Sequence, residues 1–268
     1  MAEPIVPVLT GQWAALDALL AGLDDAEWEA ETCLPGWRVR DVVAHLVGTE
    51  AQLAGEAPPE STVDVHALPY VRNDLAAANE LWVQALRPES PAAVLARFRD
   101  VTRGRAKALS AMSEAEFDAP SWTPAGPGTY RRFMDFRLFD CWCHEQDIRD
   151  AVGRPGHETG PSAERAVAQI VGALPYLVGK RAAAADGAAV TVALTGPVCR
   201  TLHVVVDGRA RLVDELDRPA TTTVSLSSGL FVRLAGGRVD PAAHLVEVGI
   251  TGDIELGRRV VENLNFTP

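Results

Sequence analysis

The sequence predicts an α+β protein of two domains, and three observations point to this class. The first part of the chain carries long apolar patterns with the helical period of about 3.6 residues. The part after Gly160 carries short segments in which apolar and polar residues alternate, as in strands. The length of 268 residues suggests two domains of roughly 150 residues each. We expect a helical bundle over residues 1–155 and a smaller α+β domain over residues 162–268.

The first domain is expected to consist of helices joined by polar loops. Leu9, Trp13, Leu16 and Leu20 form one helical stripe over residues 6–23. The same period predicts helices over residues 39–53, 70–86, 91–112 and 130–152. The connections are predicted as an acidic link over 24–27, a loop over 55–69 and an irregular surface segment over 119–129.

The second domain is expected to mix strands with helices. Alternating patterns predict strands over residues 190–194, 202–206, 209–213, 221–226 and 246–250. Asp207 and Gly208 predict a tight hairpin turn between the second and third of them. Helical patterns occupy residues 162–177, 228–234 and 254–264, and Asp253 is predicted to cap the last helix.

Charge and cysteine content exclude several classes of partner. The 36 acidic residues outnumber the 25 basic ones, which gives a net charge of −11 without a basic cluster. Nucleic acid and anionic membranes are therefore not expected as partners, because both require clustered positive charge. Four cysteines are too few for a disulfide framework. Together with an N-terminus unlike a signal peptide, this predicts a cytoplasmic protein.

The segment around His144 carries the strongest chemical signal. At about 100° per residue, Phe136, Asp140, His144 and Asp147 share one helix face, where apolar residues would otherwise be expected. An Asp and a His one turn apart can offer two ligands to one divalent metal. His45 lies at the margin of the apolar stripe of its own helix and is the candidate third ligand. Three ligands of this kind leave an open position, as in catalytic zinc sites.

A second interpretation of these residues stays open. An Asp/His pair at this spacing also occurs as a solvated, helix-stabilising interaction. Asp147 is either an acceptor that orients a ligand imidazole or a capping or surface carboxylate near the helix end. The remaining histidines are expected to be ordinary surface residues without a carboxylate partner: His66, His157, His203 and His244.

The cysteines are expected to have no catalytic role. Cys141 and Cys143 are two residues apart on one helix and so point about 200° apart, which favours packing over joint metal binding. Cys33 precedes a Pro-Gly-Trp turn and is expected to be exposed. No basic residue stands beside it to lower the pKa of its thiol.

Two segments about a hundred residues apart resemble the mycothiol-dependent maleylpyruvate isomerase family. They are Leu-Pro-Gly-Trp-Arg-Val-Arg-Asp-Val-Val-Ala-His-Leu at residues 34–46 and Asp-Cys-Trp-Cys-His-Glu-Gln-Asp-Ile-Arg at residues 140–149. The resemblance implies a DinB-like metal-binding four-helix bundle. The segments at residues 231–241 and 248–253 are similar to the sterol-carrier-like domain that this family often appends.

The resemblance also implies a set of site residues. A divalent metal, usually zinc, would be held by His45, Asp140 and His144, with Asp standing where the isomerases typically have Glu. Arg238 matches the family's C-terminal arginine, which would act as a catalytic residue by clamping a substrate carboxylate. The cofactor would be mycothiol, the small thiol of actinobacteria, held as a thiolate.

The function expected from the resemblance is that of a metal-dependent, mycothiol-using isomerase or S-transferase. The thiolate would attack a small electrophilic substrate, which would either isomerise about a double bond or leave as the thiol adduct. The alternative is a non-catalytic ligand-binding or regulatory protein that keeps the bundle as a scaffold. An apolar tunnel in the second domain, together with metal ligands too far apart to share one ion, would favour that alternative.

Overall fold

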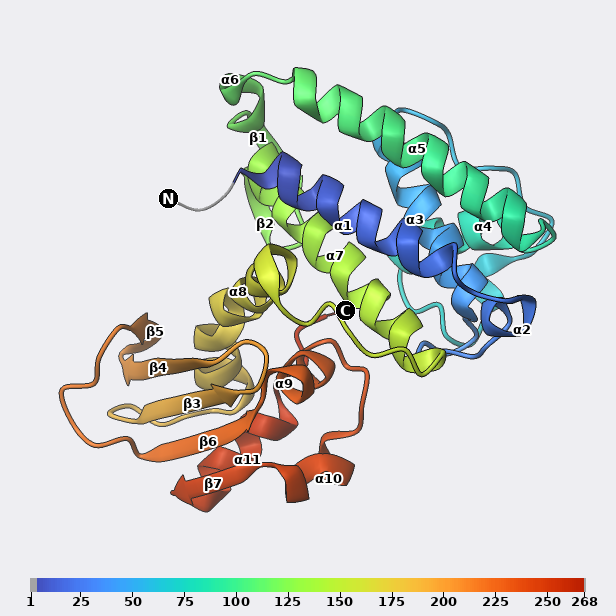
Figure 1. Cartoon of the computed structure of the whole chain (residues 1–268). Coiled ribbons are helices and arrows are strands. Elements are labelled where there is room, and N and C mark those ends of the chain that lie inside the picture. The colour runs from blue at the N-terminus through green and yellow to red at the C-terminus, as the bar shows by residue number, and fades with distance from the viewer. Residues whose placement is uncertain (1–3, 268) are drawn as a thin grey trace. The chain divides into compact units, whose positions relative to one another are not determined.

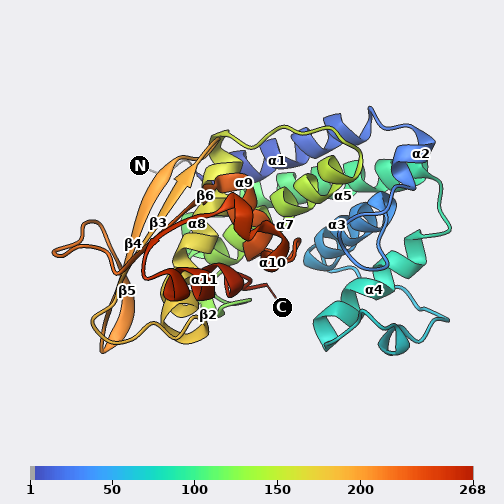
Figure 2. The same ribbon diagram turned by 90° about the horizontal axis from the view of Figure 1, so that it is seen from below.

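The computed structural model describes residues 4–267, which form two compact units (Figures 1 and 2). The first unit ends at Gly156 and the second begins at His157. Helices dominate the first unit, whereas the second combines helices with a sheet. This confirms the predicted α+β class with two domains. Within residues 4–267 no helix is both long enough and apolar enough to cross a membrane.

Four long helices form the frame of the first unit. They are α1 (Ile5–Leu20), α3 (Val39–Leu53), α5 (Pro91–Ala111) and α7 (Tyr130–Ala151). Helices α1 and α3 each pack against both α5 and α7, so the four lie side by side (Figure 1). Helix α4 (Asp74–Leu86) packs on α3. The shorter elements of the unit are α2 (Asp25–Trp28), η1 (Val65–Ala67), α6 (Glu114–Phe117), β1 (Pro120–Thr123) and β2 (Gly126–Thr129).

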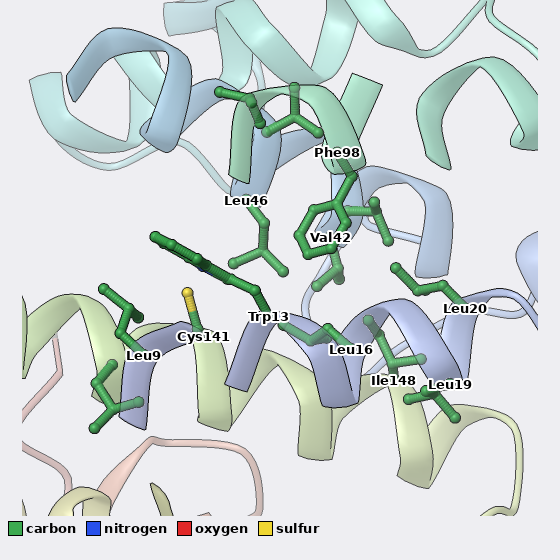
Figure 3. Close-up of a cluster of buried hydrophobic side chains, with 14 of the residues drawn as sticks. Leu9, Trp13, Leu16, Leu19, Leu20, Val42, Leu46, Phe98, Cys141 and Ile148 are labelled. Atoms are coloured by element: carbon green, nitrogen blue, oxygen red, sulfur yellow. The ribbon is translucent and has the colours of Figure 1, made fainter. Parts of the chain in front are cut away.

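The apolar core of the first unit lies where these helices meet. Leu9 and Leu16 of α1 are fully buried, and Phe98 of α5 is 1 % exposed. Figure 3 shows them with Val42 of α3 and Ile148 of α7. Burial of one such side chain stabilises the fold by about 1.5–3 kcal/mol. The core therefore holds α3 and α7 at a defined spacing, on which the polar residues of both helices depend.

The predicted irregular segment over residues 119–129 is wrong, because β1 and β2 pair there as an antiparallel hairpin. Its prolines are compatible with pairing because a two-stranded ribbon has two free edges, where a missing N–H is tolerated. Thr123 Oγ1 donates to the carbonyl of Gly126 at 2.7 Å, and Gly126 has a φ of 99°, which closes the turn. Thr129 then caps α7 by accepting from the backbone N–H of Arg132.

Two helix boundaries also differ from the prediction because side-chain caps decide them. The acidic link over residues 24–27 contains α2, since Asp24 and Glu27 form a reciprocal capping box. Helix α4 begins at Asp74 instead of residue 70, since Asn73 accepts from the N–H of Ala76.

The second unit is built on a five-stranded sheet. Its strands are β3 (Ala189–Thr195), β4 (Arg200–Asp207), β5 (Arg209–Val213), β6 (Thr222–Ser227) and β7 (Gly249–Gly252). The order is β5-β4-β3-β6-β7, with β3 and β6 parallel and the other pairs antiparallel. Helices α8 (Gly160–Tyr176), α9 (Ser228–Ala235) and α11 (Ile254–Glu262) pack against the sheet. The remaining elements are η2 (Leu177–Arg181), α10 (Pro241–His244) and η3 (Leu245–Glu247).

The strand predicted over residues 246–250 begins later than expected. Its first part is the turn η3, which follows α10, and β7 starts only at Gly249. The alternation of Val246, Val248 and Ile250 resembles a strand, but Val246 is 92 % exposed and joins no sheet. His244, expected to lack a carboxylate partner, contacts Glu247 at 2.6 Å within the same turn.

We predict that Gly48→Ala destabilises the first unit, because a Cβ at Gly48 of α3 would overlap the side chain of Trp82 on α4. The expected loss is about 1–3 kcal/mol in the free energy of unfolding, measured by urea denaturation. Gly104→Ala in α5 is the matched control, since a Cβ there meets nothing within 4 Å. It should gain roughly 0.5–1 kcal/mol. A Gly48→Ala protein as stable as the wild type would contradict the described packing.

Candidate metal centre

Helix α7 carries two candidate ligands one turn apart. Asp140 Oδ1 lies 3.5 Å from His144 Nε2, as the spacing of four residues in a helix predicts. The side chain of His144 is 8 % exposed and that of Asp140 is 31 % exposed. The pair therefore lies at the edge of the core, where one carboxylate face remains accessible.

The third candidate comes from α3. His45 Nε2 lies 3.3 Å from Asp140 Oδ2, and the His45 and His144 rings meet edge to face with centroids 4.9 Å apart. One ligand atom from each of the three side chains lies within 4.8 Å of the others. Among residues 4–267, this is the only group of three or more such side chains placed to share a metal ion. The structure thus brings together the three residues that the sequence singles out. We refer to His45, Asp140 and His144 together as the centre.

The donor set fits a divalent cation. Two imidazoles and a carboxylate are ligands that zinc accepts at three-residue sites. His45 Nδ1 is buried and has no hydrogen-bond partner in the described structure. A buried polar atom without a partner costs about 1–3 kcal/mol. Since Nε2 is the nitrogen that faces Asp140, this Nδ1 is not the atom that would bind the ion, and the fit rests on the donor set.

Asp147 lies behind the histidine of α7. Its side chain is 3 % exposed, and its Oδ2 lies 2.9 Å from His144 Nδ1. This contact directs Nε2 of the same ring toward Asp140. Of the two roles left open by the sequence, the geometry favours the acceptor that orients a ligand imidazole. Cys33 Sγ donates to the other carboxylate oxygen at 3.4 Å, so this exposed cysteine lies near the centre.

The charges around the centre give its two histidines different protonation. Burial alone would lower the pKa of His144, but Asp140 and Asp147 outweigh it and raise that pKa to about 9. Burial lowers the pKa of His45, and the neighbouring Asp140 offsets this only in part. Burial opposes the ionised form of Asp140, yet the Arg137 guanidinium and the histidines hold its pKa well below the usual range. At neutral pH the metal-free centre therefore carries one imidazolium, on His144.

An aromatic side chain covers the two histidines. The ring of Trp37 lies 5.3 Å from that of His45 and 6.3 Å from that of His144, measured between centroids. Its indole N–H donates to Glu80 Oε2 at 2.9 Å, and Tyr70 donates to the other oxygen of Glu80 at 3.1 Å. The carboxylate of this 1 % exposed Glu80 thus fixes the indole beside the centre.

Sequence reasoning missed the ion pairs beneath the centre. Arg137 and Glu50 are 5 % and 1 % exposed, and Arg137 contacts both Glu50 and Asp140. The signal that the sequence offers is a charged residue within an apolar helical pattern. Such a residue is buried only when it is paired, so it indicates a buried ion pair. Their pairing could not be predicted, since Glu50 lies 87 residues from Arg137 in the chain.

The remaining candidates are an arginine of the second unit and two buried cysteines of α7. Arg238 belongs to the second unit, where its Nη1 donates to the carbonyl of Gly236 at 2.6 Å, and its role toward a substrate stays a prediction. Cys141 and Cys143 are buried, and burial raises the pKa of the Cys141 thiol to about 12. Both cysteines therefore act in packing, as expected.

Comparisons with known proteins match both units. Residues 9–149 match the sequence profile of the mycothiol maleylpyruvate isomerase N-terminal domain. Residues 163–259 match the profile of the MDMPI C-terminal domain. Two uncharacterized proteins of Mycobacterium tuberculosis, from strains CDC 1551 / Oshkosh and ATCC 25618 / H37Rv, are 28 % identical over 154 residues. That match spans 56 % of this chain and 57 % of each relative, so it covers little more than half of their length.

Two solved isomerase structures share the fold of this chain at low sequence identity. The crystal structure of a mycothiol-dependent maleylpyruvate isomerase aligns with a TM-score of 0.56 and 17 % identity, covering 88 % of each chain. A point mutant of such an isomerase aligns with a TM-score of 0.55 and 17 % identity, covering 92 % of this chain and 91 % of the other. Sterol carrier protein 2 from Yarrowia lipolytica aligns over 39 % of this chain and 94 % of its own, with a TM-score of 0.30 and 10 % identity.

We predict that the protein purified with zinc retains about one ion per chain and that His144→Ala removes it, because the variant loses one of three ligands. Elemental analysis after desalting measures the ratio. His66→Ala is the control, since His66 is exposed and lies outside the cluster. Equal metal content in wild type and His144→Ala would exclude this site.

We predict that zinc binding at neutral pH releases about one proton, because the metal must displace the proton of His144. The pKa of that imidazole is about 9, whereas that of His45 is lowered. Affinity should therefore rise about tenfold per pH unit from about pH 7 to 8.5 and level off above about 9. Calorimetry in buffers of different ionisation enthalpy counts the protons. No proton release and constant affinity over this range would contradict the charge assignment.

Proposed function

The chain belongs to the mycothiol maleylpyruvate isomerase family, and on this premise we propose that its centre activates mycothiol for attack on a small electrophile. The observation that carries the proposal is the convergence of His45, Asp140 and His144, whose ligand atoms lie within 4.8 Å of one another. The chain would act as an isomerase or as an S-transferase. Both reactions require the same reactive thiolate.

The donor set supports a divalent cation, with zinc as the first candidate. Two nitrogens and one oxygen suit zinc and leave room for a further ligand. A cation held there would lower the pKa of an approaching thiol and hold its sulfur as a nucleophile. Asp140 is one methylene shorter than the glutamate typical of the isomerases, which shortens the reach of the carboxylate toward an ion.

The residues around the centre prepare it for this chemistry. Asp147 accepts from His144 Nδ1, which keeps Nε2 of the same ring available as a ligand. Trp37 covers both histidines with an apolar ring, which limits the access of water to a bound sulfur. Glu80 accepts a hydrogen bond from the indole N–H, which keeps the ring of Trp37 in one orientation.

The two candidate reactions share the first bond and differ in the second. The thiolate sulfur adds to an activated carbon of the electrophile, and the electron pair of its double bond moves to an adjacent acceptor group. In an isomerase, rotation about the resulting single bond precedes loss of the sulfur, so the thiolate is regenerated. In an S-transferase, a proton is taken up and the adduct leaves. Arg238 is proposed to bind a carboxylate of the substrate, since a guanidinium matches its geometry.

The non-catalytic alternative receives no support from the centre. That interpretation would be favoured by ligands too far apart to share one ion. Instead, His45 Nε2 and His144 Nε2 lie 3.3 and 3.5 Å from the Asp140 carboxylate. This convergence of two buried histidines on one carboxylate supports a centre that binds an ion.

We predict that the zinc-loaded protein consumes maleylpyruvate only when mycothiol is present. An isomerase leaves the mycothiol concentration unchanged, whereas an S-transferase consumes one thiol per electrophile; chromatography of substrate and thiol separates the two cases. His144→Ala should lower the rate by roughly 100-fold or more, and His66→Ala should not change it. If neither maleylpyruvate nor a panel of other small electrophiles reacts in a mycothiol-dependent manner, the proposed function is wrong.

A further inference from the structure

A buried ion pair contacts Asp140, one of the three candidate metal ligands. Arg137 of α7 is 5 % exposed and Glu50 of α3 is 1 % exposed. Nε and Nη2 of Arg137 donate to Glu50 Oε1 at 3.1 and 3.0 Å. These two hydrogen bonds hold the guanidinium in one place. Removal of either partner would leave an uncompensated buried charge.

The same guanidinium reaches one oxygen of the candidate ligand Asp140. Nη1 of Arg137 donates to Asp140 Oδ2 at 2.7 Å. This Oδ2 also lies 3.3 Å from His45 Nε2, whereas the other oxygen, Oδ1, faces His144 Nε2 at 3.5 Å. The two carboxylate oxygens therefore have different partners, and the arginine decides which of them is turned toward His144.

We propose that Arg137 is a positioning residue of this centre: by holding Oδ2 of Asp140, it presents Oδ1 as the oxygen available to a cation. All three nitrogens of Arg137 already donate to Glu50 or Asp140, so this arginine is not a binding group for a substrate anion. The proposal rests on the proposed function only in that the centre binds a divalent cation.

A second arginine pairs with the other oxygen of Glu50. Oε2 of Glu50 accepts from Arg105 Nε at 3.0 Å, so each oxygen of Glu50 has its own guanidinium. Arg105 Nη2 also donates to the Tyr130 hydroxyl at 2.9 Å. The network joins α5, α3 and α7. Because Glu50 lies five residues after His45 on α3, the contact between Glu50 and Arg137 also sets the spacing between His45 and Asp140.

Charge and position have opposite effects on a cation at this centre. The positive charge of Arg137 repels a metal ion, whereas its hydrogen bond to Asp140 keeps a ligand oxygen in place. A neutral substitution would mix the two effects. Arg137→Lys keeps the charge but offers one ammonium group in place of the planar fork that spans Glu50 and Asp140, so it isolates the effect of position.

The test is a zinc competition titration of the full-length protein, with the absorption spectrum of the cobalt form as a second readout. Arg137→Lys is expected to weaken zinc binding by roughly 10- to 100-fold, the usual effect of losing an outer partner of a ligand. It is also expected to change the cobalt spectrum, because a released carboxylate alters the coordination of the ion. Wild-type affinity together with a wild-type spectrum would overturn the proposal.

Arg105→Lys is the matched control. Arg105 is 4 % exposed and pairs with Glu50 as Arg137 does, but its other partners are Tyr130 and Met134 instead of Asp140. The zinc affinity of the Arg105→Lys protein should stay within about threefold of the wild type, with an unchanged cobalt spectrum. Equal weakening by the two lysine variants would overturn the proposal, because it would show a general loosening of the core.

Glu50→Gln keeps the test decisive if Arg137→Lys lacks the circular dichroism spectrum of the wild type. It replaces the anionic anchor of Arg137 by a neutral amide, whose NH2 group cannot accept from either guanidinium, and leaves Asp140 itself unchanged. Weaker zinc binding by folded Glu50→Gln would support the proposal, and unchanged binding would overturn it. A wild-type protein that binds neither zinc nor cobalt would overturn the proposed function and this inference with it. Tight wild-type binding with unaffected variants would overturn this inference alone.

Discussion

The need to pair buried charge between α3 and α7 governs the first unit. Asp140 contacts Arg137, His45 and His144, and each of these three side chains is at least nine-tenths buried. A charge in such a place is stable only with partners at hydrogen-bond distance. Glu50 supplies a further negative charge, which pairs with Arg137. The residues that fit a metal ion are thus part of the network that keeps these two helices compatible.

The apolar core makes this polar network possible. Leu9, Leu16 and Phe98 are almost entirely buried and fix the distances between the long helices. Close packing transmits small changes of volume, so a shift of α3 would move His45 relative to α7. The position of His45 therefore depends on residues that have no chemistry of their own. This dependence is typical of sites whose side chains stand on rigid helices.

The sequence predicted what depends on local periodicity and could not predict what depends on distant pairing. The helical period placed Asp140 and His144 on one face, and the apolar stripe of α3 left His45 as the third candidate. The family resemblance named the same three. The pair of Arg137 and Glu50 is non-local, so no periodicity reveals it. The hairpin over residues 120–129 was missed because its prolines and glycines are also typical of irregular segments.

The chemistry of the first unit depends on one divalent cation held by His45, Asp140 and His144. Diffraction from zinc-soaked crystals, measured on both sides of the zinc absorption edge, would locate that ion. We expect one strong anomalous peak bounded by those three side chains, with Asp147 still in contact with His144. An anomalous map with no peak there, or with zinc bound only by surface residues, would contradict it.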